Sequence, residues 1–336
     1  MITDVDPVTF TDEEESQLGH GSFKTAPWRW RREERPESQL TDAAAVSLLM
    51  TGRLKQRDLD VLRAVWMYGV MSTSQIRRLV FHTLTNRSAE VVSSRRLSHL
   101  YKAHCLNRAF RGLGSEFIYT LDLLGARIIQ MEQRKRNRRD IKWSFKGIGE
   151  KLLLIDHSLG ITEFGVTLTE AARNHPGGGG LRWWGEHVLV LKKPDDSYFN
   201  PDGMGILRLD KAALGFFLEW DRGTETPAIV GHKVKHYVDY LRNPDAWRGQ
   251  FSRFPVVLIA TTTEARVEKI LVEAQRRLQL LSGDEALTVL VTTHEALNQQ
   301  GVLNPVWHKA GATEKIDLVW GKGLSLPQIM TSQINK

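Results

Sequence analysis

Between residues 54 and 102, apolar side chains recur every three or four positions, which is typical of amphipathic helices. We predict a first helix over residues 54–68. A second helix is expected to start at the hydroxyl-bearing run 72–74, because serine and threonine are favoured at helix N-caps. A third helix is predicted over residues 88–102. Four of its apolar side chains are expected to face a core: Val91, Val92, Leu97 and Leu100.

After residue 105 the apolar positions recur with a period of two. Residues 106–110 and 117–121 alternate as paired strands do, on either side of a glycine-containing turn, and a short helix follows over residues 125–131. Three helices followed by a hairpin are the order of a winged helix. In helix-turn-helix proteins the second helix of the pair enters the major groove of DNA, and here that helix is residues 88–102.

Strand and helix patterns alternate in the second half of the chain, which predicts a mixed α/β sheet and an α/β fold class (α+β overall). A glycine-rich loop, residues 176–180, lacks the Lys-Ser/Thr ending of a phosphate-binding loop, so we reject nucleotide binding there. The most apolar of the predicted strands is 213–218. The other predicted elements are a long helix within 149–172, strands 186–192, 254–261 and 287–293, and helices 264–281 and 294–299.

The composition is that of a globular protein, with 41% hydrophobic and 25% charged residues. No apolar run approaches the roughly 20 residues that span a bilayer, and the first residues lack a signal-peptide pattern, so we expect a cytoplasmic location and no membrane partner. The single cysteine, Cys105, excludes an intramolecular disulfide and a four-cysteine zinc site, and we expect it to be buried as a small apolar residue.

The net charge of +7 is unevenly distributed. Residues 1–50 hold 5 basic and 10 acidic side chains (−5), residues 51–140 hold 18 and 7 (+11), and the remaining residues contribute +1. A positive field concentrated in one segment indicates a phosphate-backbone partner, here double-stranded DNA. The alternative is a winged helix that contacts protein and carries solvated arginines.

The candidate DNA-binding residues lie in three places. The third helix offers Ser88, Arg95, Arg96 and His99, and the hairpin offers Arg108 and Arg111. A basic run, interpreted either as a solvated linker or as an arm along the DNA backbone, contains Arg134, Lys135, Arg136, Arg138 and Arg139. Upstream, tryptophan and arginine alternate over residues 27–32, and this segment either stacks on bases or pins the tail to the folded body.

Carboxylates gather at the end of strand 213–218. Glu219 and Asp221 lie on the same side of an extended chain, because strand side chains alternate. A neighbouring antiparallel strand would present Asp202 beside Glu219. Clustered carboxylates repel one another unless a proton or a cation lies between them, and oxygen ligands suit Mg²⁺ or Mn²⁺. The alternative is that these acids are solvated charges that close a turn.

The same stretch resembles the PD-(D/E)XK nuclease core, in which an Asp on one strand precedes an acid and a Lys on the next. Pro201-Asp202 and Glu219 match this motif, but the Lys position is occupied by Asp221. Some members of that superfamily carry the Lys on the following helix, which makes Lys233 and Lys235 candidates, with Lys235 preferred. The resemblance also implies a carboxylate from the first helix of the domain, here Glu163, as a further metal ligand.

Over residues 50–300 the chain resembles the replication-relaxation family of plasmid and mobile-element proteins. The most specific carrier is Leu218-Glu219-Trp220-Asp221-Arg222-Gly223-Thr224-Glu225, and the helix–hairpin block and the Pro201-Asp202 turn also match. The resemblance implies a role in DNA replication, relaxation or transfer, with DNA and other replication or transfer proteins as partners. It also implies a winged helix fused to a nuclease-like domain.

These observations predict a largely irregular tail over 1–50, a winged-helix DNA-binding domain over 51–132 and a basic linker over 133–140. A nuclease-like α/β domain is predicted over 141–322 and a C-terminal tail over 323–336. Three hypotheses for the function remain: a DNA-binding protein of a mobile element, an active Mg²⁺-dependent endonuclease or nickase, and a non-enzymatic adaptor or regulator with a degenerate nuclease fold. In the second, Asp202, Glu219 and Asp221 are catalytic, together with Lys233 or Lys235.

Overall fold

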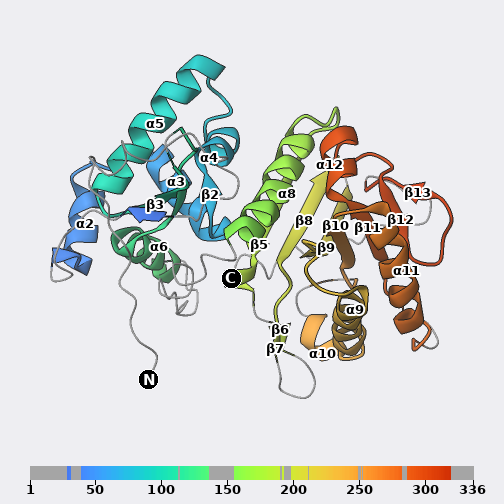
Figure 1. Ribbon diagram of the computed structural model, residues 1–336. Coiled ribbons are helices and arrows are strands. Elements are labelled where there is room, and N and C mark those ends of the chain that lie inside the picture. The colour runs from blue at the N-terminus through green and yellow to red at the C-terminus, as the bar shows by residue number, and fades with distance from the viewer. Residues whose placement is uncertain are drawn as a thin grey trace. The chain divides into compact units, whose positions relative to one another are not determined.

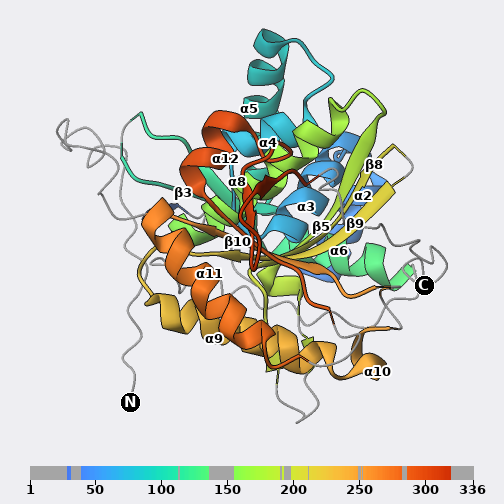
Figure 2. The ribbon, with the colours of Figure 1, turned by 90° about the vertical axis from the view of Figure 1, so that its right-hand side faces the viewer.

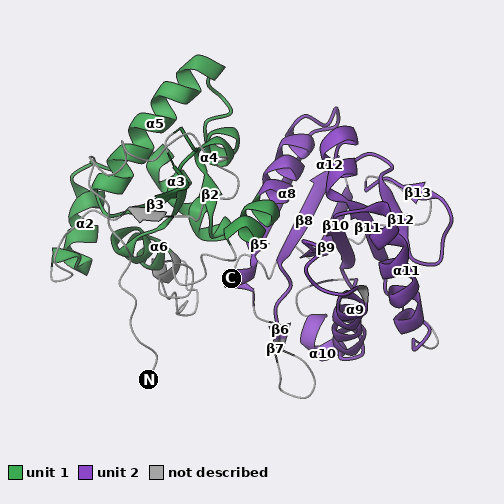
Figure 3. Cartoon of the chain, viewed as in Figure 1, with its two compact units in different colours: residues 1–162 green, residues 163–336 purple. Residues whose placement is uncertain are grey.

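The computed structural model describes residues 29–31, 39–112, 114–135, 155–189, 191–192, 198–210, 212–248, 251, 253–281 and 286–318. The chain divides into two compact units, residues 1–162 and residues 163–336 (Figure 3). The division falls inside helix α8 (Ile155–Arg173). Residues 136–154, which contain most of the predicted linker, and the predicted C-terminal tail lie outside the described residues.

Unit 1 has the order of helices and hairpin that the hydrophobic pattern predicts (Figure 1). The hairpin strands pair antiparallel, and they are flanked by two further strands in the order β1-β3-β4-β2. The elements are α3 (Gln56–Tyr68), β2 (Met71–Ser72), α4 (Thr73–Val80), α5 (Asn86–Lys102), β3 (Leu106–Phe110), β4 (Ile118–Leu121) and α6 (Leu123–Lys135).

Two elements lie within the segment that we expected to be irregular. Strand β1 (Arg29–Arg31) pairs antiparallel with β3, so the backbone of residues 29–31 lies on the sheet; the side chains of the Trp/Arg segment lie outside the described part of the molecule, and both interpretations of it stay predictions. Helix α2 (Asp42–Met50) starts at Thr41, whose Oγ1 accepts a hydrogen bond from the Ala44 amide at 3.2 Å. The expectation of an irregular tail is therefore wrong for these residues, because an N-cap threonine followed by alanines favours a helix.

The start of α4 follows the sequence signal. Ser72 Oγ accepts from the Gln75 amide at 3.2 Å, and Gln75 Oε1 accepts from the Ser72 amide at 2.9 Å, which completes a capping box. On α5, the prediction that Val91 faces the core is wrong, since its side chain is 62% exposed. The buried face instead follows Ala89, Ser93 and Leu97, which recur every fourth residue, and Val91 lies on the opposite side of the helix.

A buried carboxylate joins α3 to α5. Asp58 is fully buried, and its Oδ1 accepts from Arg96 Nε at 2.6 Å while the other Arg96 nitrogen binds Oδ2. The Lys55 amide also donates to Asp58 Oδ2, at 2.7 Å. A carboxylate in this environment requires a cation and hydrogen-bond donors, so Arg96 stabilises unit 1.

Unit 2 contains a seven-stranded sheet in the order β13-β12-β11-β10-β9-β8-β5. The three central strands are parallel and both edges are antiparallel, as predicted for a mixed sheet. The strands are β5 (Gly179–Gly185), β8 (Gly203–Leu209), β9 (Ala212–Trp220), β10 (Val256–Thr261), β11 (Val289–Thr293), β12 (Trp307–Lys309) and β13 (Lys315–Ile316).

Helices cover both faces of this sheet. On one face lie α9 (Pro227–Leu241) and α11 (Glu264–Leu278), which run side by side and connect the parallel strands (Figure 2). On the other face, Phe164 of α8 packs against the Phe216 and Trp307 rings. Phe217 belongs to the core under α9 and α11. Because side chains alternate along β9, Glu219 points to the same face as Phe217.

The segment before β8 differs from the prediction. Residues 186–192 are a short 3₁₀ turn, η3 (Glu186–Val188), and strand β6 (Leu191–Lys192), which pairs with β7 (Tyr198–Phe199). The sheet strand is β5, which includes the last glycines of the predicted loop. At Gly179 a Cβ would lie 2.5 Å from the Arg208 carbonyl oxygen, so a glycine allows β5 to approach β8. A short helix, α10 (Pro244–Trp247), follows α9, and α12 (His294–Gln300) follows β11.

Among the described residues, none of the helices combines the length and the apolar character needed to cross a bilayer.

The Asp58–Arg96 pair generates a first prediction. R96A leaves a fully buried carboxylate without its cation, and we expect it to lower the free energy of unfolding by about 3 kcal/mol. The matched control is R95A, which removes an exposed arginine from the same helix and is expected to change stability by less than about 0.5 kcal/mol. Urea denaturation followed by circular dichroism measures both, and equal effects of the two changes would contradict the structural role of Arg96.

Candidate functional site

One face of α5 carries exposed side chains that are mainly cationic. We call Arg87, Val91, Arg95 and Lys102, which are all exposed, the α5 stripe. The first three recur every fourth residue and therefore lie on one side of the helix. Among the described residues, no carboxylate forms an ion pair with Arg87, Arg95 or Lys102. The stripe therefore presents uncompensated positive charge to solvent.

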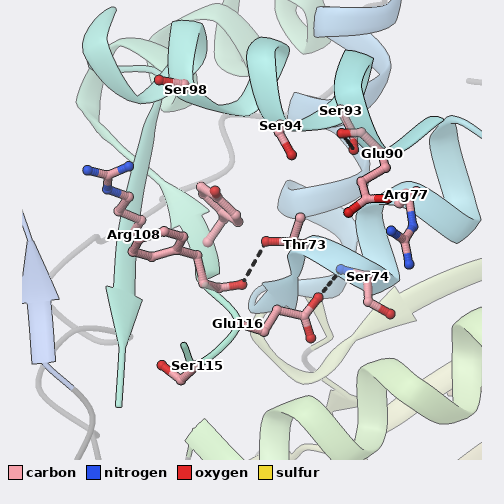
Figure 4. Close-up of a pocket in the computed structure, with 12 residues that line it drawn as sticks. Thr73, Ser74, Arg77, Glu90, Ser93, Ser94, Ser98, Arg108, Ser115 and Glu116 are labelled. Carbon is pink, nitrogen blue, oxygen red and sulfur yellow. Dashed lines mark hydrogen bonds between the residues drawn. The ribbon is translucent and has the colours of Figure 1, made fainter. Parts of the chain in front are cut away.

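Beside this helix lies a hollow of about 330 Å³ between α4, α5 and the β3–β4 hairpin (Figure 4). Hydroxyl groups dominate its lining, and we call it the hydroxyl hollow. Two arginines and two glutamates also reach it. The lining residues are Thr73, Ser74, Arg77, Glu90, Ser93, Ser94, Ser98, Arg108, Ser115, Glu116, Phe117 and Tyr119.

Arg108 is held rigidly at this hollow. Its guanidinium lies 4.0 Å from the centroid of the Tyr101 ring and 4.7 Å from that of Phe117. Cation–π contacts on two rings orient the group without neutralising its charge. Arg108 can therefore offer hydrogen-bond donors to an anion, and its role in DNA binding stays a prediction.

The start of α4 lies at the edge of the same hollow. Thr73 Oγ1 donates to the Phe117 carbonyl oxygen at 3.2 Å, which ties the helix to the hairpin. The Ser74 amide donates to Glu116 Oε1 (Figure 4). A helix N-terminus favours negative charge, and the Glu116 carboxylate supplies it here.

Several predicted DNA-binding residues either form ion pairs within unit 1 or have side chains outside the described part of the molecule. Arg96 is committed to Asp58, and Arg111 pairs with Asp156, so the prediction that these two contact DNA is not supported by their geometry. Ser88 is exposed and His99 is partly buried on α5. Arg134 and Lys135 end helix α6, but their side chains, like residues Arg136, Arg138 and Arg139, lie outside the described part of the molecule.

In unit 2 the predicted acidic residues meet a lysine and a tyrosine. Gly203 is paired with Leu218 in the β8–β9 register, which places Asp202 opposite Glu219 as expected, and Asp202 Oδ2 accepts from the Trp220 amide at 2.7 Å. We call Asp202, Glu219, Lys233 and Tyr237 the acid–lysine cluster. Glu219 Oε1 accepts from Tyr237 Oη at 2.5 Å, and Lys233 Nζ lies 3.2 Å from Glu219 Oε2.

Glu219 is the most perturbed acid of this cluster. Burial and the neighbouring Asp202 carboxylate raise its pKa to about 7, and the Lys233 ammonium and the Tyr237 hydroxyl oppose this rise only in part. The pKa of Lys233 is raised as well, because Glu219, Asp202 and Glu225 together outweigh its burial. Glu219 therefore exchanges a proton near neutral pH while Lys233 stays charged.

The two candidate lysines point in different directions from α9. Lys233 and Tyr237 are four residues apart and face the sheet together. Lys235 points away from them and binds Asp239 Oδ2 at 2.6 Å on its own helix. The preference for Lys235 is therefore corrected, and Lys233 is the lysine of the cluster.

Asp221 has a structural role instead of the predicted catalytic one. Its carboxylate accepts from Arg266 Nη2 at 2.9 Å and also binds Arg266 Nε, and it accepts from Thr261 Oγ1 at 2.5 Å and the Gly223 amide at 3.0 Å. These donors lower the pKa of Asp221 against its burial. All of its oxygen positions are occupied, so Asp221 holds the loop after β9 to the first turn of α11.

The predicted ligands of a divalent cation in this cluster are the two carboxylates of Asp202 and Glu219. Asp202 and Glu219 lie close enough for their charges to interact, which is the donor chemistry that Mg²⁺ or Mn²⁺ uses together with phosphate and water. Glu163 on α8 accepts from Thr167 Oγ1 at 3.1 Å. Within the described ranges, His, Cys, Asp and Glu form no group of three or more that is arranged to hold a metal, so Glu163 does not complete such a set.

Sequence reasoning missed four contributors: Arg77 and Glu116 at the hydroxyl hollow, Tyr237 at Glu219, and Arg266 at Asp221. Tyr237 follows Lys233 by one helical turn, and this spacing is a signal that was present in the sequence. Arg266 and Glu116 carry no comparable signal, because each lies about 40 residues away from its partner along the chain.

A family model described as replication-relaxation matches residues 62–257, more than half of the chain. The matched range covers both the α5 stripe and the acid–lysine cluster. Comparisons with curated proteins and with solved structures gave no significant match.

The pKa of Glu219 generates a prediction for metal-free protein. Between about pH 4.5 and 7 the folded state retains a proton that the unfolded chain has released, so raising the pH in this range favours unfolding. We expect unit 2 to lose up to about 3 kcal/mol of stability across this interval. Urea unfolding in EDTA, followed by tryptophan fluorescence from pH 5 to 8, measures this loss. E219Q is expected to show a flatter pH dependence, and parallel curves for the two proteins would contradict the assignment.

Proposed function

The chain belongs to the replication-relaxation family, and from that premise we propose that it is a DNA-binding protein of a plasmid, phage or other mobile element. Its role would lie in DNA replication, relaxation or transfer. Unit 1 would bind duplex DNA as a winged helix, with α5 in the major groove and the β3–β4 hairpin beside it.

The observation that carries this proposal is the α5 stripe. Residues 51–140 have a net charge of +11, and on α5 Arg87, Arg95 and Lys102 are exposed to solvent. Neutralisation of DNA phosphates by such side chains supplies most of the affinity for duplex DNA. Val91 lies between two of these arginines and is 62% exposed, which suits contact with a thymine methyl group.

The hydroxyl hollow supports the proposed placement of α5 in the major groove of DNA. Serine and threonine hydroxyls and arginines are frequent donors to phosphate oxygens, and these contacts position a protein on DNA without reading sequence. Ser94, Ser98 and Arg77 lie at the hollow beside α5. A phosphate that flanks the groove bound by α5 would find its donors there.

A second candidate function is metal-dependent cleavage of DNA by unit 2. The observation that favours it is the position of Lys233, 3.2 Å from Glu219, where the resemblance to PD-(D/E)XK nucleases places a lysine beside two acids. A divalent cation bound by Asp202 and Glu219 would activate a water molecule for attack on phosphorus. Lys233 would neutralise charge on the scissile phosphate, and Tyr237 would hold the Glu219 carboxylate in position.

The duplex-binding proposal predicts the effect of R77A combined with R95A. Removing two phosphate contacts is expected to weaken binding at least about tenfold at moderate salt, and to reduce the slope of log K against log salt by about two. Fluorescence anisotropy with a labelled duplex measures both quantities. The control R63Q removes a charge from unit 1 that is already paired with Asp60 and Glu132, and it should leave the slope unchanged. An unaltered slope in the double variant would count against groove binding by α5 and favour an adaptor.

The cleavage hypothesis predicts nicking of a supercoiled plasmid in Mg²⁺ or Mn²⁺ but not in EDTA. D202A, E219Q and K233M are each expected to reduce the rate by at least about a hundredfold, because they remove a cation ligand or the charge beside it. K235M is the matched control, since Lys235 lies on the same helix and binds Asp239. Nicking that survives all three substitutions would exclude this site, and a wild-type protein without nicking would leave duplex binding as the function.

A further inference from the structure

A second hollow lies between residues of α9 and Arg277 of α11. Its volume is about 620 Å³, within the roughly 300–1,000 Å³ that is typical of small-molecule sites. Figure 2 shows α9 and α11 side by side along this face of unit 2. We call it the imidazole hollow, and its lining residues are Ala228, Ile229, His232, Lys233, His236 and Arg277.

Flat and apolar groups line this hollow. The His232 and His236 rings, one helical turn apart, have centroids 5.5 Å apart and meet at 78°. The Phe199 ring lies 6.0 Å from His236 and supports it from β7. Ile229, which is 49% exposed, adds an apolar side chain to this lining. These surfaces suit a planar ring as a ligand.

Cationic groups lie beside the same surfaces. Arg277 of α11 lines the hollow, and the described residues offer it no ion-pair partner, whereas its neighbour Arg276 is paired with Glu273 at 2.5 Å. Lys233 also lines the hollow, and its ammonium contacts Glu219. The imidazole hollow and the acid–lysine cluster therefore share a wall.

We infer that the imidazole hollow binds one nucleotide of a single-stranded nucleic acid next to the acid–lysine cluster. The base stacks on the His232 ring, meets the nearly perpendicular His236 ring edge to face and contacts Ile229, and Arg277 binds the phosphate. Single-strand-binding proteins combine ring faces with a cation along the backbone in this way. An acidic peptide would use the cation but not the ring faces. The inference rests on unit 2 acting on DNA, and it is independent of duplex binding by α5.

The test measures binding of the full-length protein to a fluorescein-labelled (dT)₁₂ strand, in EDTA, by anisotropy. R277Q is expected to weaken binding about tenfold, and the matched control R276Q, one residue away and outside the hollow, less than twofold. H232A is expected to lose about tenfold, and H232F, which retains a ring but no ring nitrogen, to recover most of this loss. An oligomer of abasic sites should bind wild type about tenfold more weakly than (dT)₁₂, and H232A should not weaken it further.

The outcomes separate this inference from the others. Equal binding of (dT)₁₂ and the abasic strand, equal effects of R277Q and R276Q, or competition by hexaglutamate as strong as by unlabelled (dT)₁₂ would each overturn it. Duplex binding by R277Q should match that of wild type, so a loss of single-strand binding alone supports the hollow. Loss of duplex binding in the R77A/R95A protein, with (dT)₁₂ binding retained, would support the duplex site separately.

Discussion

A carboxylate that is removed from water must be given a cation or several hydrogen-bond donors, and this constraint shapes both units. Asp58 in unit 1 takes Arg96 and a backbone amide, and Asp221 in unit 2 takes Arg266, a threonine hydroxyl and a backbone amide. In each case the partner comes from another element, so the ion pair fixes the position of a helix. The acids with the most complete sets of donors are therefore parts of the scaffold.

The buried charge of Glu219 is less completely compensated by cations and hydrogen-bond donors than the charges of Asp58 and Asp221. It has a tyrosine hydroxyl and the Lys233 ammonium as partners, but burial and Asp202 still raise its pKa to about 7. Asp221, only two residues away, has a lowered pKa because its donors prevail. Perturbed acids of this kind concentrate at functional sites, since a site that must bind a proton or a cation cannot also be saturated by donors. The opposite pKa shifts therefore distinguish Glu219 from Asp221, although the sequence pattern places both at the end of the same strand.

The arginines of unit 1 likewise differ in whether a carboxylate compensates their charge. Arg96 and Arg111 are matched to carboxylates and stabilise the fold, whereas Arg108 is oriented by two aromatic rings that leave its charge available. The exposed cations of the α5 stripe have no ion-pair partner among the residues that the structure describes. Net charge therefore does not distinguish the arginines that are held in ion pairs from those whose charge stays exposed, and only the ion pairs of the folded chain do so.

The sequence by itself determined the helix–hairpin order of residues 54–131, the N-cap of α4, the mixed sheet and the pairing of Asp202 with Glu219, because these follow from local periodicity and from the register of one short hairpin. It also carried the family signature in and after β9. Only the tertiary structure decided that Lys233 and not Lys235 meets Glu219, that Asp221 belongs to Arg266, and that Arg96 belongs to Asp58. Those choices depend on which helix face packs on the sheet and on partners about 40 residues away, and neither is encoded in the spacing of neighbouring residues.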